Sequence, residues 1–345
     1  MSGTSANFDI IVIGAGPAGS ATAIASRQSG LKTLIVEADA TFRDRPGETL
    51  HPGMESVFRR LGVLNEIEQA GFLRHAGHRI WREGQTFFRP YGADKRGVWR
   101  GYQATRSELD RILLDRARAA GAEIHRPARA MDVVVENGRT VGVRTSSGVF
   151  GTSFVVDAAG PGHWLQRRLE LPVLEVSNPL IARFGWESIA DQHDGAPEFH
   201  VLGCGWRWEA PVQTGKRAWV ALELDRISKC RGTKARDVTW RMVRPCAGAG
   251  YFLAGDAAFV LDPACSHGVL KALISGVEAG NAAARVLTQG ADESAVKATY
   301  CSWMESWFCG DASALLSLYA DFAPAPSWLE SAREALRYIS MNPFL

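Results

Sequence analysis

One stretch near the start of the chain, FDIIVIGAGPAGSATAIASRQSGLKTLIVEAD, restricts the possible folds more than any other. An apolar strand over residues 8–13 runs into three glycines, a helix of small residues and a second strand that ends at Glu37. Gly14 permits the tight turn, Gly16 lets the backbone approach a pyrophosphate, and Gly19 lets helix and strand pack closely. The start of the helix favours phosphate, and Glu37 is placed to accept hydrogen bonds from a ribose. The stretch predicts a Rossmann-like unit that binds a dinucleotide.

A second stretch, YFLAGDAAFVLDPACSHGVLKALISGVEAG, identifies the dinucleotide. Its apolar strand ends at Gly255 and Asp256, its loop carries Pro263, and Gly268 opens another helix rich in small residues. The free N–H groups at the start of that helix suit a negatively charged group, such as the N1/C2=O edge of a reduced flavin. The stretch also resembles a second FAD fingerprint, and this resemblance implies that the cofactor is FAD.

Together with YQATRSELDRILLDRARAAGAEI, these stretches resemble the FAD fingerprints of the aromatic hydroxylase superfamily, the p-hydroxybenzoate hydroxylase type. The resemblance covers about residues 8–290. It implies that Asp256 holds the ribityl chain of FAD and that Gln103 and Arg106 contact the cofactor. It also implies an α/β fold, in which an FAD-binding Rossmann-like domain of the GR2 type carries an antiparallel-sheet substrate domain.

In this fold the FAD domain is discontinuous along the chain. Alternating apolar and polar residues, as in RAWVALELD, favour antiparallel sheet in the middle of the sequence. The C-terminal segment lies outside the resemblance, has helical apolar spacing, and is expected to be a short helical packing cap. We assign 1–74, 100–165 and 246–290 to the FAD domain, 75–99 and 166–245 to the substrate domain, and 291–345 to the C-terminal segment.

Three shorter motifs resemble the flavin-dependent halogenase branch of the superfamily. GWRWEAP resembles G-W-x-W-x-I-P, RPGETLHPG contains a version of G-E-S-L-x-P, and DPACSHGV resembles D-P-x-x-S-x-G-V. The resemblance implies that Trp206 and Trp208, which share one face of a strand, separate the flavin chamber from the substrate cavity. Rigid apolar rings at that position exclude water and select the substrate. The alternative is that both indoles only fill the core between the domains.

The residue expected at one position of this branch is absent. Halogenases of the phenol type carry a lysine in G-F-x-x-K-x-G, whereas the matching GFLRHAG has His75 at that position. A neutral imidazole acts as a base or hydrogen-bond partner but does not replace an ammonium group. We place His75 facing the substrate, Glu48 and His51 near the flavin ring, and His267 beside the helix start. For each histidine a purely structural role stays open.

The source of electrons is indicated by a second departure. Hydroxylases that reduce their own flavin carry a D-G motif, and VVDAAGPG has Ala159 in place of that aspartate. No second glycine-rich βαβ unit is apparent. We therefore expect reduced flavin to come, directly or indirectly, from NAD(P)H through a separate flavin reductase.

These observations predict an FAD-dependent monooxygenase that hydroxylates an electron-rich aromatic compound through a flavin C4a-hydroperoxide. The substrate is expected to be an indole or phenol, either a small molecule or a tryptophan side chain of a partner protein. Alternatives are a flavin-dependent halogenase, a polyprenyl-type flavin reductase, and a flavin-binding regulatory module without turnover.

Composition excludes several other classes. The 39 basic and 37 acidic residues leave a net charge of +2, which does not indicate a nucleic-acid partner. The cysteines lack metal-type spacing, so we expect no metal site. The N-terminus has no signal-peptide pattern, and no apolar run is long enough to span a membrane. We expect a cytoplasmic location.

Overall fold

The glycine-rich stretch lies at the centre of an eight-stranded sheet in the computed structural model, which describes residues 7–190, 195–225 and 233–342. The strand order is β10-β2-β1-β13-β12-β11, and β22 pairs with β13 and with β21. The pairings of β1 with β2 and β13, of β2 with β10 and of β13 with β22 are parallel. The strands are β1 (Asn7–Ile13), β2 (Thr33–Val36), β10 (Glu123–His125), β11 (Ala130–Glu136), β12 (Arg139–Thr145), β13 (Gly148–Asp157), β21 (Ala247–Gly248) and β22 (Tyr251–Leu253).

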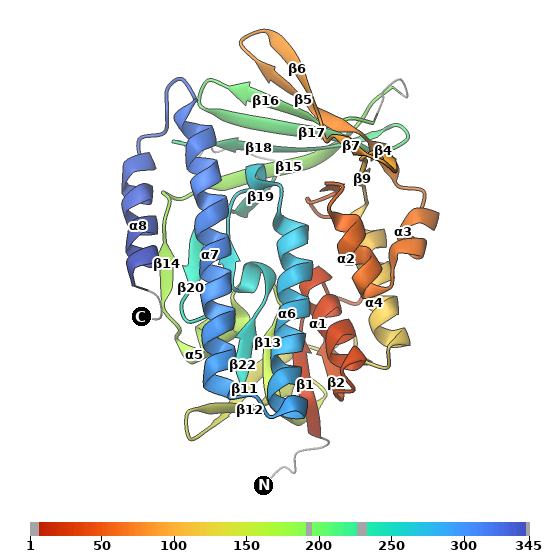
Figure 1. The fold of residues 1–345 in the computed structure, drawn as a ribbon, viewed down its shortest axis with the longest axis vertical. Helices are drawn as coiled ribbons and strands as arrows, with labels where there is room; N and C mark the ends of the chain where they lie inside the picture. The colour runs from red at the N-terminus through yellow and green to blue at the C-terminus, as the bar shows by residue number, and fades with distance from the viewer. Residues whose placement is uncertain (1–6, 191–194, 226–232, 343–345) are drawn as a thin grey trace.

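Two helices rich in small residues, α1 (Pro17–Gln28) and α6 (Gly268–Gln289), pack tightly against each other beside this sheet (Figure 1). A Cβ atom added to Gly276 would lie 2.2 Å from the carbonyl oxygen of Ala18, so only glycine permits this approach. The remaining helices of this part are α2 (Met54–Leu61), α3 (Leu64–Gln69), α4 (Arg106–Ala119) and α5 (Trp164–Leu169).

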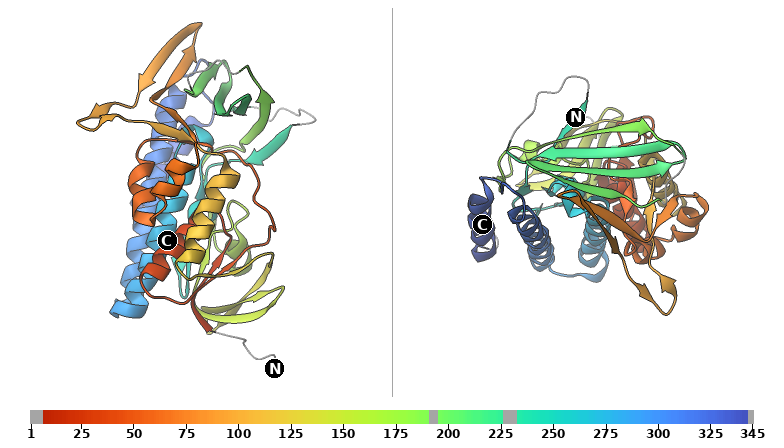
Figure 2. Two further views of the ribbon diagram at one scale, coloured as in Figure 1. Left: turned by 90° about the vertical axis from the view of Figure 1, so that its right-hand side faces the viewer. Right: turned by 90° about the horizontal axis from the view of Figure 1, so that it is seen from above.

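The second sheet has seven strands in the order β19-β15-β18-β17-β16-β5-β6 and lies across one end of the molecule (Figure 2). All its pairings are antiparallel except that between β16 and β5. Its strands are β5 (Gly77–Arg82), β6 (Gln85–Pro90), β15 (Ile181–Ser188), β16 (Glu198–Leu202), β17 (Gly205–Gln213), β18 (Lys216–Glu223) and β19 (Lys234–Asp237).

Three small sheets complete the fold. Their strands are β3 (Thr49–Leu50), β4 (Leu73–His75) and β9 (Gly101–Gln103); β14 (Val173–Glu175), β20 (Arg241–Val243) and β23 (Phe259–Val260); and β7 (Ala93–Asp94) with β8 (Gly97–Val98). Short 3-10 turns, Gly255–Ala257 and Pro263–Cys265, precede α6.

The chain ends in the 28-residue helix α7 (Glu293–Ala320) and in α8 (Leu329–Met341). Figure 1 shows that α7 runs beside α6 along most of the molecule, up to the second sheet. The predicted fold class is therefore confirmed, while the limits of the two domains remain a prediction. Among the described residues, no helix has the length and apolarity needed to cross a membrane. Within the same residues, no cluster of three or more His, Cys, Asp or Glu side chains is arranged to hold a metal ion.

Candidate active site

A cavity of about 620 Å³ receives its lining from both main sheets. It collects most of the residues that the sequence singled out, although they come from distant parts of the chain. The predicted residues that line it are Gly14, Gly16, Glu37, Glu48, His51, Arg106, Trp206, Trp208, Gly255, Asp256, Pro263, His267 and Gly268.

The end of the cavity beside α1 has the features of a phosphate site. Gly14 has a φ of +100°, and a Cβ there would lie 2.6 Å from the carbonyl oxygen of Ala158. Among the described residues, no side chain caps the start of α1 at Gly16, so the N–H groups that follow Pro17 are available to an anionic ligand. The Glu37 carboxylate is held by the backbone N–H groups of Ala15 and Asp39, both at 2.7 Å. These donors and this fixed carboxylate fit the pyrophosphate and ribose of FAD.

Substitutions at Gly16 and Gly19 should separate cofactor binding from folding. Gly16 has an extended backbone, and no heavy atom lies within 4 Å of an added Cβ. We expect Gly16→Val to fold normally and to bind FAD at least about tenfold more weakly, because its side chain occupies the phosphate space. In Gly19→Ala the new Cβ would lie 1.9 Å from the Gly14 carbonyl oxygen. This overpacking should lower the free energy of unfolding by about 2 kcal/mol. FAD titration and urea unfolding of the apoprotein test both, and normal FAD affinity in Gly16→Val would contradict the assignment.

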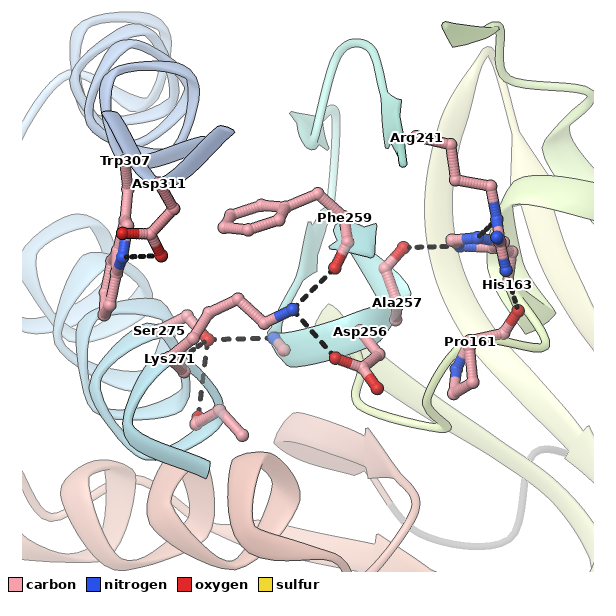
Figure 3. Close-up of polar contacts among 12 residues, drawn as sticks. Pro161, His163, Arg241, Asp256, Ala257, Phe259, Lys271, Ser275, Trp307 and Asp311 are labelled. Atoms are coloured by element: carbon pink, nitrogen blue, oxygen red, sulfur yellow. Dashed lines mark hydrogen bonds and ion pairs between the residues drawn. The ribbon is translucent and has the colours of Figure 1, made fainter. Parts of the chain in front are cut away.

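An ion pair between the buried Lys271 and the partly exposed Asp256 lies at the cavity (Figure 3). Lys271 of α6 is only 4% exposed and donates to Asp256 Oδ1 at 2.8 Å and to the carbonyl oxygen of Phe259 at 2.7 Å. Burial alone would raise the pKa of Asp256, but the charge and hydrogen bond of Lys271 hold it below its usual value. The carboxylate is therefore ionised and suited to accept hydrogen bonds from ribityl hydroxyls. Asp256 is among the residues predicted from the sequence, whereas Lys271 is not.

The start of α6 meets the C-terminal helix α7 at the cavity. His267 Nδ1 lies 2.9 Å from Asp311 Oδ1, and the ring of His51 lies 5.8 Å from that of His267. Asp311 also lines the cavity. The C-terminal segment therefore contributes to the cavity as well as to packing, because α7 is long enough to pass the start of α6 and place a side chain there.

The side of the cavity formed by the second sheet is aromatic. The indoles of Trp206 and Trp208 line it together with Phe199 and Trp219. The alternation of β17 places both indoles on the same face, and the Phe199 ring lies 5.7 Å from Trp206 and 6.1 Å from Trp208. The two tryptophans thus contribute to the packed core and to the cavity wall at once.

A chain of hydrogen bonds fixes the deeper indole. Trp206 Nε1 donates to the hydroxyl of Tyr319 at 2.9 Å, and that hydroxyl donates to Asp262 Oδ1 at 2.8 Å. Trp240 Nε1 donates to the other oxygen of Asp262 at 2.7 Å. The second sheet, α7 and the loop before α6 are therefore joined through one buried carboxylate.

The carboxyl group of Glu48 is an unusually weak acid. It is 6% exposed, and Trp186 Nε1 donates to its Oε1 at 3.1 Å. Burial raises the pKa of the Glu48 carboxyl to about 7. A cavity carboxyl that exchanges its proton near neutral pH is able to serve as an acid or a base.

The acidity of Glu48 predicts a pH-dependent stability. Between pH 4.5 and about 7 the folded protein keeps a proton on Glu48 that the unfolded chain has released. The free energy of unfolding should therefore fall as the pH rises through this range, and Glu48→Gln should remove about 3 kcal/mol of that fall. Urea unfolding of both apoproteins at several pH values measures the difference. A constant difference across the range would contradict the raised pKa.

Three predicted residues do not line the cavity. His75 on β4 is buried, its Nδ1 lies 3.1 Å from the carbonyl oxygen of Gly77, and it pairs with Gly101 of β9. A Cβ on Gly101 would lie 2.7 Å from its ring, so the side chain packs against β9 and is not part of the cavity lining. Gln103 is also buried, and its Oε1 accepts a hydrogen bond from Thr49 at 2.8 Å. Gly19 lies inside α1 and serves packing.

The altered D-G position lies at the cavity. Ala159 is part of its lining, and its backbone N–H donates to Asp157 Oδ1 at 2.9 Å. The other oxygen of Asp157 accepts from the backbone of Leu165 at 2.7 Å. This fully buried carboxyl, whose pKa burial raises to about 6, holds the loop and does not replace the missing aspartate.

The comparisons with known proteins agree with this geometry. The FAD binding domain family matches residues 7–189, which is more than half of the chain. A 1H-pyrrole-2-carbonyl-(peptidyl-carrier protein) chlorinase of Pseudomonas fluorescens is 26% identical, over 78% of this chain and 74% of its own length.

Solved structures share the fold. The myxobacterial chondrochloren halogenase CndH matches 99% of this chain and 91% of its own with a TM-score of 0.84 at 21% identity. The peptidyl tryptophan dihydroxylase QhpG matches 95% of this chain and 79% of its own with a TM-score of 0.73 at 21% identity. The chain belongs to the FAD binding domain family, and it is an FAD-dependent enzyme of the halogenase-like branch of the aromatic monooxygenases.

Proposed function

We propose that this enzyme transfers one oxygen atom from O₂ to an electron-rich aromatic ring, an indole or a phenol. The observation that carries the proposal is the continuous cavity, which runs from the phosphate site at α1 to the aromatic wall of the second sheet. An aromatic substrate against Trp206 and Trp208 gains apolar burial and ring stacking. The fold shared with a peptidyl tryptophan dihydroxylase supports including tryptophan within a polypeptide among the substrates.

The cofactor and the chain have separate tasks. Bound reduced FAD supplies the activation of O₂. With FAD bound, the backbone at Gly14 and Gly16 would hold the pyrophosphate, Glu37 would hold the ribose, and Asp256 would accept hydrogen bonds from the ribityl hydroxyls. The indoles of the aromatic wall orient the substrate and keep water out, which limits loss of the reactive oxygen.

Hydroxylation is favoured over halogenation by the state of the cavity's lysine. Among the described residues, Lys271 is the one lysine in the lining, and its ammonium is engaged by Asp256 and the Phe259 carbonyl. It is therefore not free to carry a halogen to a substrate. Halogenation is the second candidate, because the similar pyrrole-carrier enzyme is a chlorinase. The aromatic wall weighs against a long aliphatic polyprenyl substrate.

The proposed separate reductase is tested by anaerobic absorbance of the FAD-loaded enzyme. Added NADH or NADPH should leave the flavin band unchanged, since Ala159 lacks the carboxylate of self-reducing hydroxylases. Adding a flavin reductase should then bleach the band completely. Rapid bleaching by NAD(P)H alone would show that the enzyme reduces its own flavin.

A further inference from the structure

We propose that Asp311 of α7 is a positioning residue that makes His267 and His51 an acid–base relay on the flavin side of the cavity. The inference rests on the proposed function in one respect, that oxygen chemistry occurs in this cavity. It adds a role for the C-terminal helix, and it names the side chains that move protons there.

The first step is the fixed orientation of Asp311. Its Oδ1 lies 2.9 Å from His267 Nδ1, and its Oδ2 accepts a hydrogen bond from Trp307 Nε1 at 3.0 Å (Figure 3 shows the Trp307 contact). With both oxygens engaged, the carboxylate has little freedom to rotate. It therefore keeps a proton on Nδ1 of His267 and leaves Nε2 to exchange one, as a carboxylate–histidine pair does in acid–base catalysis.

The second step is the complementary state of His51. Its Nδ1 accepts the backbone N–H of Gly53 at 3.1 Å, which places the proton of the neutral ring on Nε2. That buried Nε2 has no hydrogen-bond partner among the residues that the structure describes. A buried donor without a partner is costly in a finished core but expected where a ligand or water completes the site. The ring faces His267 edge to face at 5.8 Å.

The third step is the opposite tuning of the two rings. The hydrogen bond and charge of Asp311 raise the pKa of His267 despite its partial burial. Burial, with a smaller effect of the His267 charge, lowers the pKa of His51. Neighbouring titratable groups with divergent acidities are suited to act as acid and base partners.

Other charged groups near the start of α6 are already committed. Asp262 is bonded to Tyr319 and Trp240, and Lys271 is bonded to Asp256. Burial raises the pKa of the adjacent Cys265 thiol to about 12, so this thiol is neutral. Asp311 is therefore the group that sets the charge of His267.

The test compares Asp311→Asn with wild type in two measurements. In NMR titrations of the apoprotein, the midpoint of His267 should fall by about one pH unit in the variant, because the stabilising charge is removed. In stopped-flow absorbance, the pH profile for reoxidation of the reduced FAD-loaded enzyme by O₂ should shift in the same direction. His267→Gln should remove the part of that pH dependence that follows the His267 midpoint.

Two further variants provide a second test and a control. Trp307→Phe removes one hydrogen bond to Asp311 and should produce a smaller shift of the same sign, which provides a second test if Asp311→Asn folds poorly. Glu330→Gln, exposed on α8, removes one negative charge away from the cavity and should change neither measurement.

Two results would overturn the relay: an unchanged His267 midpoint in Asp311→Asn and Trp307→Phe, or an unchanged reoxidation profile when the midpoint has moved. Neither measurement contains an aromatic substrate. An enzyme that shows both shifts but oxygenates no aromatic compound would refute the proposed function and retain the relay.

Discussion

Replacing Asp256 with asparagine should weaken FAD binding strongly and destabilise the protein. The neutral amide leaves the ammonium of Lys271 buried without its counter-charge. Breaking such a pair by removing one partner is strongly destabilising, and because Asp256 is partly exposed in the cavity we expect a loss of about 2 to 3 kcal/mol in the free energy of unfolding. The affinity for FAD should fall at least about a hundredfold, since a charged acceptor for ribityl hydroxyls is lost. Urea unfolding and FAD fluorescence titration measure the two effects.

A double variant separates these effects. Lys271→Met combined with Asp256→Asn removes the buried charge and should recover most of the stability, while FAD affinity stays low. The single Lys271→Met variant should fold but bind FAD more weakly, because Asp256 loses the charge that keeps it ionised. Wild-type stability and wild-type FAD affinity in Asp256→Asn would show that the ion pair contributes neither to folding nor to cofactor binding.

Truncating Trp206 should produce the second large effect. The indole is 1% exposed, and Trp206→Ala should lower the free energy of unfolding by about 3 to 5 kcal/mol through the space left behind. Trp206→Phe keeps most of the ring but leaves the Tyr319 hydroxyl without its donor, so about 1 to 2 kcal/mol is expected. Urea unfolding gives both values.

The same variants test the wall function under reductase-supplied turnover. If the wall keeps water from the reaction, Trp206→Phe should release more hydrogen peroxide per O₂ consumed than wild type. Trp208→Phe changes the other indole of the wall, which donates to the Thr49 hydroxyl at 3.2 Å and is less buried, and it should also release more hydrogen peroxide. Wild-type coupling in both variants would restrict Trp206 to a structural role.

Features encoded by local spacing were predictable from the sequence. Gly14, Gly16 and Glu37 belong to one βαβ unit, and Asp256 follows directly from a buried strand, so their placement needs no knowledge of tertiary contacts. The fold class followed from these motifs and from the alternation in the substrate domain.

Long-range contacts were not predictable. Lys271 pairs with Asp256 because the 3-10 turn Gly255–Ala257 lies beside the first turns of α6. Asp311 reaches His267 because α7 runs back along α6. The sequence offered one signal, a basic residue inside an otherwise apolar helix start at 268–275, which indicates a buried partner.

The placement of His75 illustrates the limit of short motifs. GFLRHAG matched a halogenase pattern over a few positions, yet its strand pairs with β9 and packs the ring beside Gly101. Strand pairing, which the motif does not encode, decided where the side chain lies.

The most direct test of the account is the mass spectrum of products formed by the enzyme with a flavin reductase, isotopically heavy O₂ and bromide. The substrates would be indole, phenol and a tryptophan-containing peptide. The account predicts a product that carries one heavy oxygen atom and forms at the same rate without bromide. A brominated product that requires bromide would contradict it and assign the cavity to halogenation.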